Sequence, residues 1–441
     1  MSKYRFKIQN YHAIKEADIA IDGITVIAGP NGSGKSTLSR WLYYVIDTIT
    51  DFDGYLLTDF RENIKELLIT LYRIRMEVSL GRRTSSDVLP LPQIDMDAIS
   101  SVNDIDQIPL IVERLHVLVS DYSKVILDYF QSDRISDAKK NRILRFLSKD
   151  DSQSDIYTAV EGFSVSLNQK LDLLQKHVVA RSYLRNREDA VSFIHDILNE
   201  EDNVPANVEL SEDNVNVWDK RLGTLLGIAQ VIYIDTPMPF ELSDIKNNIF
   251  LKRLYDRMTV PSKALAPAQK KLLQRISLIL SGQIALRKNL FEDDKLYYER
   301  KDGKLSLPLD KLATGMKTFA YLFQLLKNGC LNDKTVLMVD EPEVHLHPQW
   351  VVQYAHIVVL LHKMLGVKIV LASHNPDFVA AIHAISKKEK VADKTNFYLS
   401  KKIDGSSYEY DFEPLGNNIN PIFESFNLAL TRIQQYGDTD F

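Results

Sequence analysis

Residues 29–37 have the composition and spacing of a loop that binds phosphate. The run Gly-Pro-Asn-Gly-Ser-Gly-Lys-Ser-Thr fits the pattern GxxxxGK[ST]. Backbone N–H groups of such a turn converge on one concavity, and the following helix adds the positive end of its dipole. Lys35 can reach the β- and γ-phosphates of a nucleoside triphosphate, and the Ser36 hydroxyl can ligate Mg²⁺. The predicted ligand-binding residues are Asn31, Gly32, Ser33, Gly34, Lys35, Ser36 and Thr37.

Two adjacent carboxylates follow an apolar run far along the chain. Residues 335–339 predict a buried strand, and Asp340 and Glu341 come directly after it. Asp340 is placed to hold the Mg²⁺ shell. Glu341 can orient and activate a water molecule for in-line attack on the γ-phosphorus. A strand that ends in Asp-Glu can also simply open a solvated turn, but a phosphate loop in the same chain favours the catalytic interpretation.

A histidine follows a third apolar run. Residues 367–372 predict a strand, with Ser373 and His374 at its carboxyl end. Ligands of parallel α/β sheets lie at that edge. His374 can hydrogen-bond a γ-phosphate and respond to its loss, although a histidine after a strand is often incidental.

A glycine-containing loop before a helix is a further candidate phosphate contact. Residues 312–317, Leu-Ala-Thr-Gly-Met-Lys, precede an apolar helical pattern that we expect to end at Gly329. Gly315 would permit close approach of the backbone to a phosphate, and the helix amino end supplies positive potential. An ordinary junction between a loop and a helix is the alternative.

The elements that must position these residues alternate between strands and helices at both ends of the chain. Residues 24–28 predict a strand before the phosphate loop and residues 38–46 a helix after it. Later segments predict a strand at 230–234, a helix at 264–280, hairpins around 302–303 and within 396–412, and a helix at 422–435.

The middle of the chain is mostly helical by its apolar spacing and has no sustained heptad repeat. Because the phosphate loop and its partner motifs lie on either side of this helical segment, we predict a single α/β core. Residues 1–50 and 226–441 form this core, and residues 51–225 are a large α-helical insertion in it.

Composition excludes several classes of protein. The 441 residues are 45% hydrophobic and 26% charged, which is ordinary for a globular protein. The net charge of −5 gives no general case for binding nucleic acid or membrane. The single cysteine, Cys330, excludes an internal disulfide framework and fits a reducing cytosol. With no signal-peptide pattern and no long uncharged apolar run, we expect a cytoplasmic protein without membrane contact.

The order of these motifs resembles the ABC-type ATPase head. Residues 340–348, Asp-Glu-Pro-Glu-Val-His-Leu-His-Pro, and 372–376, Ala-Ser-His-Asn-Pro, are similar to the soluble AAA-family branch of these ATPases. That branch is similar to SMC proteins, OLD nucleases and ATPase subunits of anti-phage systems such as Septu and PARIS. The resemblance implies a mixed sheet flanked by helices, with an antiparallel β subdomain. It also implies hydrolysis of ATP to ADP and phosphate, with catalytic residues Lys35, Glu341 and His374 and metal ligands Ser36 and Asp340. We expect this hydrolysis to be slow, because the chain departs from the family pattern at Ala313 and has no clear glutamine for the nucleotide site.

In that family two heads pack head to tail around ATP. The resemblance implies that Thr314, Gly315 and Lys317 would face the γ-phosphate held by a second copy, and that residues 343–348 would form a loop at the interface. The usual signature serine is Ala313 in this chain. Hydrogen bonding from this loop to phosphate would then be weaker, or would be made by Thr314.

Some assignments stay open at this point. Gln230 is a weak candidate for the glutamine that contacts the nucleotide site in this family, and Tyr11 is a weak candidate for stacking on adenine. His345 and His347 could suggest a metal site, but a third ligand is missing.

Residues 375–441 are too few for the TOPRIM nuclease domain that OLD nucleases carry, so we expect another polypeptide to do any cutting. Basic residues in the insertion leave contact with nucleic acid open, although interleaved acidic residues are typical of a solvated face. These residues are Lys139, Lys140, Arg142, Arg145, Arg181, Arg185 and Arg187.

The expected function is an ATPase that forms a homodimer or higher oligomer through ATP. It would regulate an effector nuclease encoded nearby, in prokaryotic anti-phage defence. The alternatives are an SMC-like DNA-maintenance ATPase that acts directly on DNA, and the nucleotide-binding subunit of a transporter.

Overall fold

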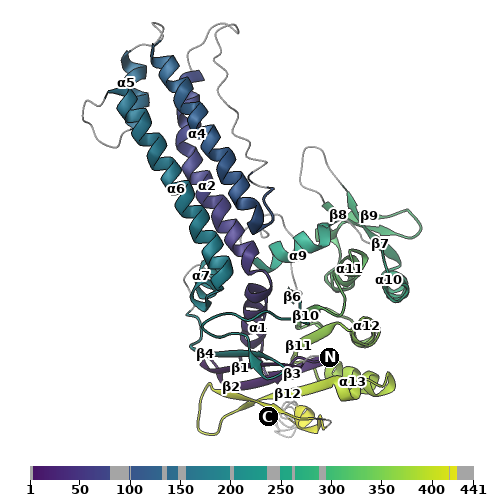
Figure 1. Cartoon of the computed structure of the whole chain (residues 1–441). Coiled ribbons are helices and arrows are strands. Elements are labelled where there is room, and N and C mark those ends of the chain that lie inside the picture. The colour runs from purple at the N-terminus through teal and green to yellow at the C-terminus, as the bar shows by residue number, and fades with distance from the viewer. Residues whose placement is uncertain are drawn as a thin grey trace, which may run out of the picture. The chain divides into compact units, whose positions relative to one another are not determined.

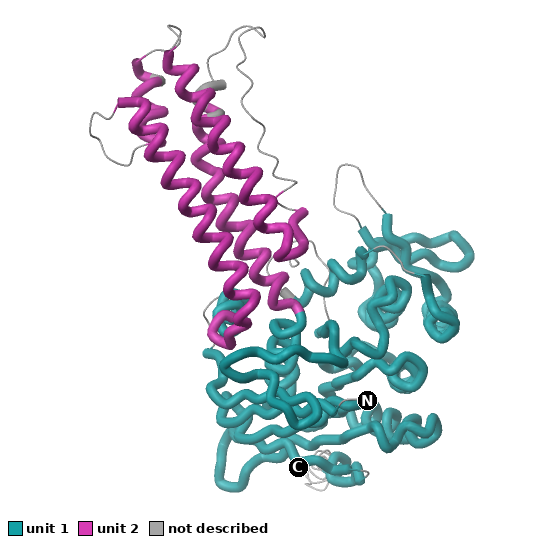
Figure 2. Tube along the Cα trace, in the orientation of Figure 1, with its two compact units in different colours: residues 1–50, 190–441 teal, residues 51–189 magenta. Residues whose placement is uncertain are grey.

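The computed structural model describes residues 3–79, 99, 101–131, 137–147, 155–198, 203–235, 249–260, 264–287, 295–416 and 418–424. The chain divides into two compact units, which Figure 2 shows in different colours. The first unit contains residues 1–50 and 190–441, and the second contains residues 51–189.

The boundary after residue 189 differs from the sequence-based expectation of residue 225. Residues within 207–216 form strands β4 (Asn207–Glu212) and β5 (Val215–Asn216) of the first unit. Strand β4 pairs antiparallel with β1 (Tyr4–Tyr11), near the amino end of the chain. This pairing accounts for the difference.

A mixed ten-stranded sheet is the centre of the first unit in the described part of the chain (Figure 1). Its order is β5-β4-β1-β2-β13-β12-β3-β11-β10-β6. The strands not yet given are β2 (Ile14–Ala20), β3 (Ile24–Ala28), β6 (Gln230–Asp235), β10 (Thr335–Asp340), β11 (Lys368–Ser373), β12 (Thr395–Lys402) and β13 (Tyr410–Pro414). Neighbouring strands from β12 to β6 are parallel, so their carboxyl ends meet at one edge of the sheet.

The parallel strands whose ends meet here are apolar because both faces of the sheet are covered. Every residue of β3, β10 and β11 is buried. Such strands appear as continuous apolar runs, which is why the sequence predicted them. Helix α1 (Lys35–Thr50) packs against β6, β10 and β11, and α12 (Pro348–Leu365) packs against β11 and α13 (Pro376–Lys388).

A second, three-stranded antiparallel sheet completes the first unit. It contains β7 (Gly282–Arg287), β8 (Lys295–Arg300) and β9 (Ser306–Pro308), and the β8–β9 hairpin confirms the predicted turn around residues 302–303. Helices α9 (Ile249–Thr259), α10 (Pro267–Leu280) and α11 (Thr314–Lys327) also belong to this unit, with the short 3₁₀ helices η2 (Leu309–Lys311) and η3 (Ala392–Lys394).

Helix α11 ends as the sequence predicted. Gly329 has a φ of 71°, its N–H bonds Leu326 O at 3.1 Å, and the Cys330 N–H bonds Leu325 O at 2.9 Å. These two bonds are the Schellman pattern of a helix terminus. The architecture predicted from the sequence, a mixed α/β core with an antiparallel β subdomain and a helical insertion, is confirmed. Of the predicted last helix, residues 425–435 lie outside the described residues.

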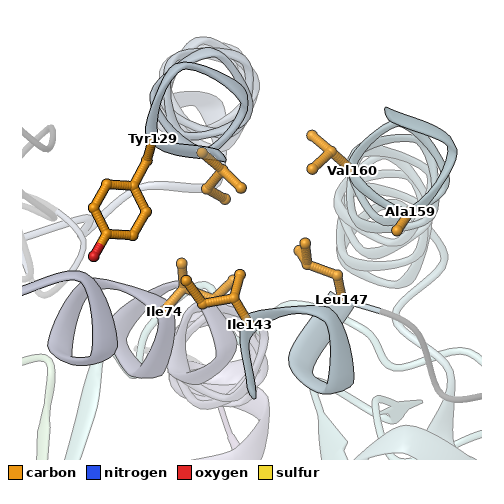
Figure 3. Close-up of a cluster of buried hydrophobic side chains, with 7 residues drawn as sticks. Ile74, Tyr129, Ile143, Leu147, Ala159 and Val160 are labelled. Carbon is orange, nitrogen blue, oxygen red and sulfur yellow. The ribbon is translucent and has the colours of Figure 1, made fainter. Parts of the chain in front are cut away.

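The second unit is helical, as predicted for this part of the chain. It contains α2 (Phe52–Ser79), η1 (Ile105–Gln107), α4 (Ile108–Gln131), α5 (Asp137–Leu147) and α6 (Ile156–Leu184), and α7 (Arg187–Leu198) begins in it. Helix α6 packs against α2, α4 and α5. Figure 3 shows the buried cluster that these four helices share: Ile74, Ile126, Tyr129, Ile143, Leu147, Ala159 and Val160.

Some of the basic residues in this unit have partners within it. The Arg181 guanidinium forms ion pairs with Asp59 at 3.0 Å and Asp189 at 2.8 Å. The Arg185 guanidinium lies over the Phe52 ring, 5.0 Å from its centroid. The side chain of Lys139 lies outside the described residues.

Candidate functional site

The phosphate loop is held from behind by strand β12. Gly29 has a φ of 152°, and a Cβ on it would lie 1.7 Å from Ser400 Oγ. The Ser400 hydroxyl donates to Ser33 Oγ at 2.8 Å. In contrast, a Cβ on Gly32, where φ is 76°, would meet no atom within 4 Å. The loop is therefore closed on its inner side and open where a ligand would approach.

The predicted loop residues differ in exposure. Asn31 and Gly32 are exposed, Gly34, Ser36 and Thr37 are half-buried, and Ser33 and Lys35 are buried.

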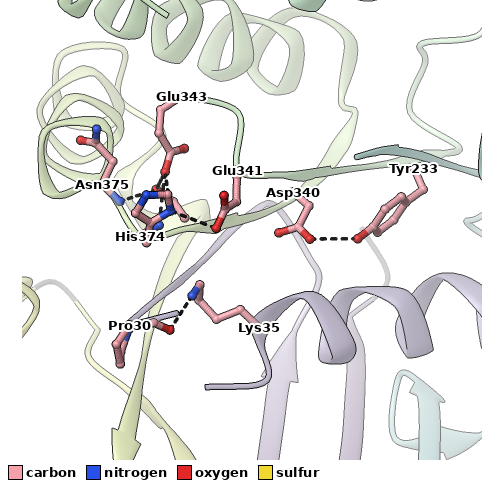
Figure 4. Close-up of polar contacts among 9 residues, drawn as sticks. Pro30, Lys35, Tyr233, Asp340, Glu341, Glu343, His374 and Asn375 are labelled. Carbon is pink, nitrogen blue, oxygen red and sulfur yellow. Dashed lines mark hydrogen bonds and ion pairs between the residues drawn. The ribbon is translucent and has the colours of Figure 1, made fainter. Parts of the chain in front are cut away.

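Lys35 is a buried cation that faces carboxylates. Its Nζ donates to Pro30 O at 2.8 Å, as Figure 4 shows. Burial lowers the pKa of Lys35, whereas Glu341, Asp340 and, more weakly, Glu343 raise it. An ammonium group has three donors, and among the described residues one is bonded. The remaining donors fit a phosphate group.

Asp340 lies at the carboxyl end of β10 and is also buried, with 3% of its surface exposed. The Tyr233 hydroxyl donates to Asp340 Oδ2 at 3.2 Å (Figure 4). Burial raises the pKa of Asp340, and hydrogen bonds with the Ser36 and Tyr233 side chains oppose that rise.

The residues around Asp340 fit Mg²⁺. A serine hydroxyl and a carboxylate are the hard oxygen ligands that Mg²⁺ prefers. Within the described ranges, no group of three or more His, Cys, Asp and Glu side chains could hold a metal. Mg²⁺ bound with a nucleotide needs only one or two carboxylates, since phosphates and waters complete its shell.

Glu341 and His374 form a pair at the same edge. Glu341 Oε1 lies 2.9 Å from His374 Nδ1, and their side chains are 30% and 37% exposed, so both are accessible. Glu341 has a φ of 49°, a left-handed conformation that is uncommon for a residue other than glycine. Its N–H donates to Ala372 O at 2.8 Å, which fixes this turn to the end of β11. Strained residues of this kind cluster at functional sites.

Glu343 is a member of the site that the sequence assigned only to an interface loop. It is 5% exposed, and its Oε1 accepts hydrogen bonds from Ser373 Oγ at 2.7 Å and the His374 N–H at 3.2 Å. The same oxygen lies 3.7 Å from His374 Nδ1. Burial raises the pKa of Glu343, and the bond with Ser373 lowers it in part. Glu343 therefore positions the backbone that carries His374.

A second missed group lies at the end of β6. Asp235 pairs in register with Asp340, and its Oδ2 lies 3.2 Å from Arg40 Nη2. Burial raises the pKa of Asp235, and Arg40 opposes that rise. The sequence could have indicated Asp235, because an aspartate follows the apolar run 230–234 just as Asp340 follows the run 335–339.

Residues 314–317 lie apart from Lys35 within this chain. They begin α11, which packs against α10 and β7, whereas α1 packs against β6 (Figure 1). Thr314 and Lys317 are half-buried. Gly315 is buried, and a Cβ on it would lie 2.9 Å from His345 O and 3.3 Å from Leu346 Cδ2. The close approach that requires glycine here is thus to the chain itself.

The two weak candidates, Gln230 and Tyr11, both make contacts within the fold. Gln230 lies at the amino end of β6, where its Nε2 donates to Cys330 O at 2.6 Å and Thr335 Oγ1 at 3.0 Å. The Tyr11 ring is buried and stacks on His12, with centroids 4.1 Å apart.

His345 and His347 belong to no metal-binding group among the described residues. His347 is the N-cap of α12, and its Nδ1 accepts from the Gln349 N–H at 3.4 Å. Its role in the structure is to begin this helix.

Comparison with known families gives one match over most of the chain. The family described as "AAA domain, putative AbiEii toxin, Type IV TA system" matches residues 24–380. No curated protein matches the chain. In the described ranges, no helix has the length and apolar character needed to cross a membrane.

Solved structures with a similar arrangement include SMC head domains. The Smc head domain of Pyrococcus furiosus, with an extended coiled coil and bound to the C-terminal domain of ScpA, is 10% identical, with a TM-score of 0.34 over 98% of this chain and 100% of that one. The SMC head domain of Thermotoga maritima is 11% identical, with a TM-score of 0.34 over 94% of this chain and 99% of that one. CbiO1 of Clostridium perfringens, part of the ABC transporter complex cbiONQ, is 14% identical. Its TM-score is 0.26, over 58% of this chain and 84% of that one. Likenesses this low carry no functional argument.

Proposed function

The chain belongs to the family described as "AAA domain, putative AbiEii toxin, Type IV TA system", and from this premise we propose that it is an Mg²⁺-dependent ATPase. One observation carries the proposal. The buried Lys35 of the phosphate loop faces Asp340 and Glu341, which lie some three hundred residues later in the chain. A buried cation, a buried carboxylate and an accessible carboxylate at one sheet edge are the groups that phosphoryl transfer to water requires.

Each side chain has a distinct role in this mechanism. Lys35 and the N–H groups of the loop bind the phosphates, and Ser36 and Asp340 would hold Mg²⁺, which would neutralise phosphate charge. Glu341 takes a proton from water as the water oxygen bonds to the γ-phosphorus and the bond to ADP breaks. His374 holds Glu341 through the 2.9 Å contact and can meet the γ-phosphate from the same edge.

The test of nucleotide binding is Lys35→Ala, measured by calorimetric titration with ATP and Mg²⁺. We expect binding to fall by at least about 10- to 100-fold, because hydrogen bonds from a charged donor are each worth about 1.5–3 kcal/mol. Lys363→Ala is the matched control, since Lys363 is a 43% exposed lysine on α12 that pairs with Glu389. Equal ATP affinity in wild type and Lys35→Ala would overturn the assignment of the site.

We also propose that ATP joins two copies head to tail, with Thr314, Gly315 and Lys317 of one copy beside the γ-phosphate held by the other. The start of α11 supports this, because the N-cap Ala313 makes no side-chain hydrogen bond to the first turn. The N–H groups of the first turn of α11, together with the helix dipole, then favour binding of an anion. Light scattering of Glu341→Gln should show a doubled mass when ATP is added, and an unchanged mass from a monomeric protein would contradict the dimer.

The biological role that we propose is regulation of an effector, a nuclease encoded nearby, in prokaryotic anti-phage defence in the cytoplasm. The family description names a toxin of a toxin–antitoxin system, which supports action together with a partner. The genes that flank this one test the proposal, and an adjacent nuclease gene is the expected result. Turnover that DNA stimulates in a salt-dependent manner would instead favour an SMC-like ATPase acting directly on DNA.

A further inference from the structure

Tyr233 contacts the proposed metal site but belongs to none of the motifs that identify it. It lies on β6, next to β10 in the sheet, and is 2% exposed. Its hydroxyl donates to Asp340 Oδ2 at 3.2 Å, as Figure 4 shows. A buried tyrosine hydroxyl generally has a hydrogen-bond partner, and here that partner is the carboxylate assigned to Mg²⁺.

Arg40 places a positive charge near the Tyr233 hydroxyl. The positive charge of Arg40 opposes the rise that burial causes in the pKa of Tyr233, and Arg40 Nη2 lies 3.2 Å from Asp235 Oδ2. A guanidinium can only donate, so the Tyr233 oxygen can act only as an acceptor toward Arg40. The one proton of the hydroxyl is then directed to Asp340.

The Tyr233 ring is held by two other aromatic rings. The Phe250 ring lies 4.7 Å from it between centroids, and the Tyr43 ring lies 5.8 Å away in an edge contact. All three residues are buried. Rings packed in this way cannot turn without displacing their neighbours, so the hydroxyl stays at the carboxylate.

Helix α1 therefore reaches Asp340 by two routes. Ser36 and Arg40 are four residues apart on this helix and lie on one face of it. The Ser36 side chain lowers the pKa of Asp340 in part, and the charge of Arg40 acts on the Tyr233 hydroxyl that donates to Asp340. The helix that carries the end of the phosphate loop thus also orients the carboxylate opposite it.

We propose that Tyr233 is a positioning residue that orients the Asp340 carboxylate toward Mg²⁺, and that Arg40 directs its hydroxyl proton. The inference rests on the proposed function, in which Ser36 and Asp340 hold the metal. Outer partners that orient a metal ligand typically change metal affinity by about 10- to 100-fold when they are removed.

Tyr233→Phe tests this, because it removes the hydroxyl and keeps the ring. Mn²⁺ binding in the presence of ATP, followed by electron paramagnetic resonance, should weaken by about 10- to 100-fold. The Mg²⁺ concentration for half-maximal hydrolysis should rise by the same factor, with turnover at saturating Mg²⁺ changed far less. ATP binding without metal should stay the same.

Tyr43→Phe is the matched control. Tyr43 is buried in the same aromatic contact, and its hydroxyl has no hydrogen-bond partner in the part of the chain that the structure describes. Its Mn²⁺ affinity should equal that of wild type. If Tyr43→Phe weakened the metal as much as Tyr233→Phe, ring packing would explain both results and the inference would be overturned.

A second variant keeps the inference testable if Tyr233→Phe does not fold. Arg40 is 46% exposed, so Arg40→Gln should be tolerated, and it should weaken Mn²⁺ binding by a smaller factor. Unchanged Mn²⁺ affinity in the folded variants would overturn the role of Tyr233 while leaving ATP binding by Lys35 intact. Wild-type protein that bound neither ATP nor Mn²⁺ would instead refute the proposed function itself.

Discussion

The carboxyl edge of the large sheet and the helical cluster of the second unit are both buried, but different interactions fill them. At the sheet edge, Lys35, Asp340 and Glu343 are charged side chains that are at most 5% exposed. The helical cluster is made of aliphatic side chains and one tyrosine (Figure 3). Burying apolar groups stabilises a fold, whereas burying charges costs free energy unless they are paired.

The difference indicates what each region provides. The sheet edge keeps desolvated charges close together, where electrostatic contacts with a phosphate are stronger than in water. The helical cluster provides stability to its unit. Substitutions at the edge should therefore change binding or chemistry more than stability, and substitutions in the cluster should do the reverse.

The largest effect expected at the edge is that of Glu341→Gln. The substitution keeps the shape of the side chain but removes the base, so hydrolysis should fall by about 10²- to 10⁴-fold while ATP still binds. Phosphate release under saturating ATP measures this. Glu413→Gln, at a 47% exposed position on β13, should behave as wild type. A loss of only two- or threefold with Glu341→Gln would show that another group activates water.

In the helical cluster, Ile143→Ala should have the largest effect on stability. Ile143 is fully buried, so the truncation should cost about 2–5 kcal/mol in free energy of unfolding, from lost burial and the cavity left behind. Urea denaturation followed by circular dichroism measures the cost, and Val117→Ala, at a 58% exposed position on α4, is the control. Loss of ATP affinity in folded Ile143→Ala protein would contradict the claim that the cluster affects stability and not binding.

Gly315→Ala compares a crowded helical glycine with an open one. A Cβ at 315 would lie 2.9 Å from His345 O, so overpacking should destabilise the protein by about 1–3 kcal/mol. Gly162, on α6, has no atom within 4 Å of its Cβ position. Gly162→Ala should instead stabilise by about 0.5–1 kcal/mol, because alanine favours a helix interior. Melting temperatures compare the two variants, and equal shifts would contradict the contact with His345.

The smallest expected effect is on the pH dependence of stability, through Glu343→Gln. Burial raises the pKa of Glu343 above its ordinary value of 4.5, so the ionised form is disfavoured in the folded state. Wild type should therefore lose stability as the pH rises through the raised pKa, a loss that Gln at this position avoids. The melting temperature of Glu343→Gln relative to wild type should increase as the pH rises from the ordinary value of 4.5 toward neutrality.

Glu389→Gln provides the opposite sign. The hydrogen bond with Lys363 lowers the pKa of Glu389, so its ionised form stabilises the fold above the unfolded value. This variant should be less stable than wild type at neutral pH, and the difference should disappear on acidification. The same trend in both variants would show that the burial of Glu343 does not control its ionisation.

The sequence predicted the parts of the fold and site that depend on local pattern. Strands β3, β10 and β11 were evident as apolar runs, because buried parallel strands have no polar face. The structure brings together Lys35, Asp340, Glu341 and His374, whose positions after those runs indicated one sheet edge.

Features that depend on pairing between distant segments could not be predicted. Strand β4 joins β1 across some two hundred residues, and nothing in either segment specifies the other. The contact of Tyr233 with Asp340 and that of Glu343 with Ser373 likewise depend on which side chains meet after folding. The sequence indicated that Gly315 permits a close approach of the backbone. Only the structure shows that the neighbouring atom is the carbonyl oxygen of His345.

The contact between Ser33 and Ser400 has a consequence for synthesis of the protein on the ribosome. The two residues are 367 positions apart, and strand β3 lies between β11 and β12, both from the last quarter of the chain. A nascent chain exposes its glycine loop early but lacks the strands that flank and support it. The loop therefore gains the strands that support it only when translation is nearly complete.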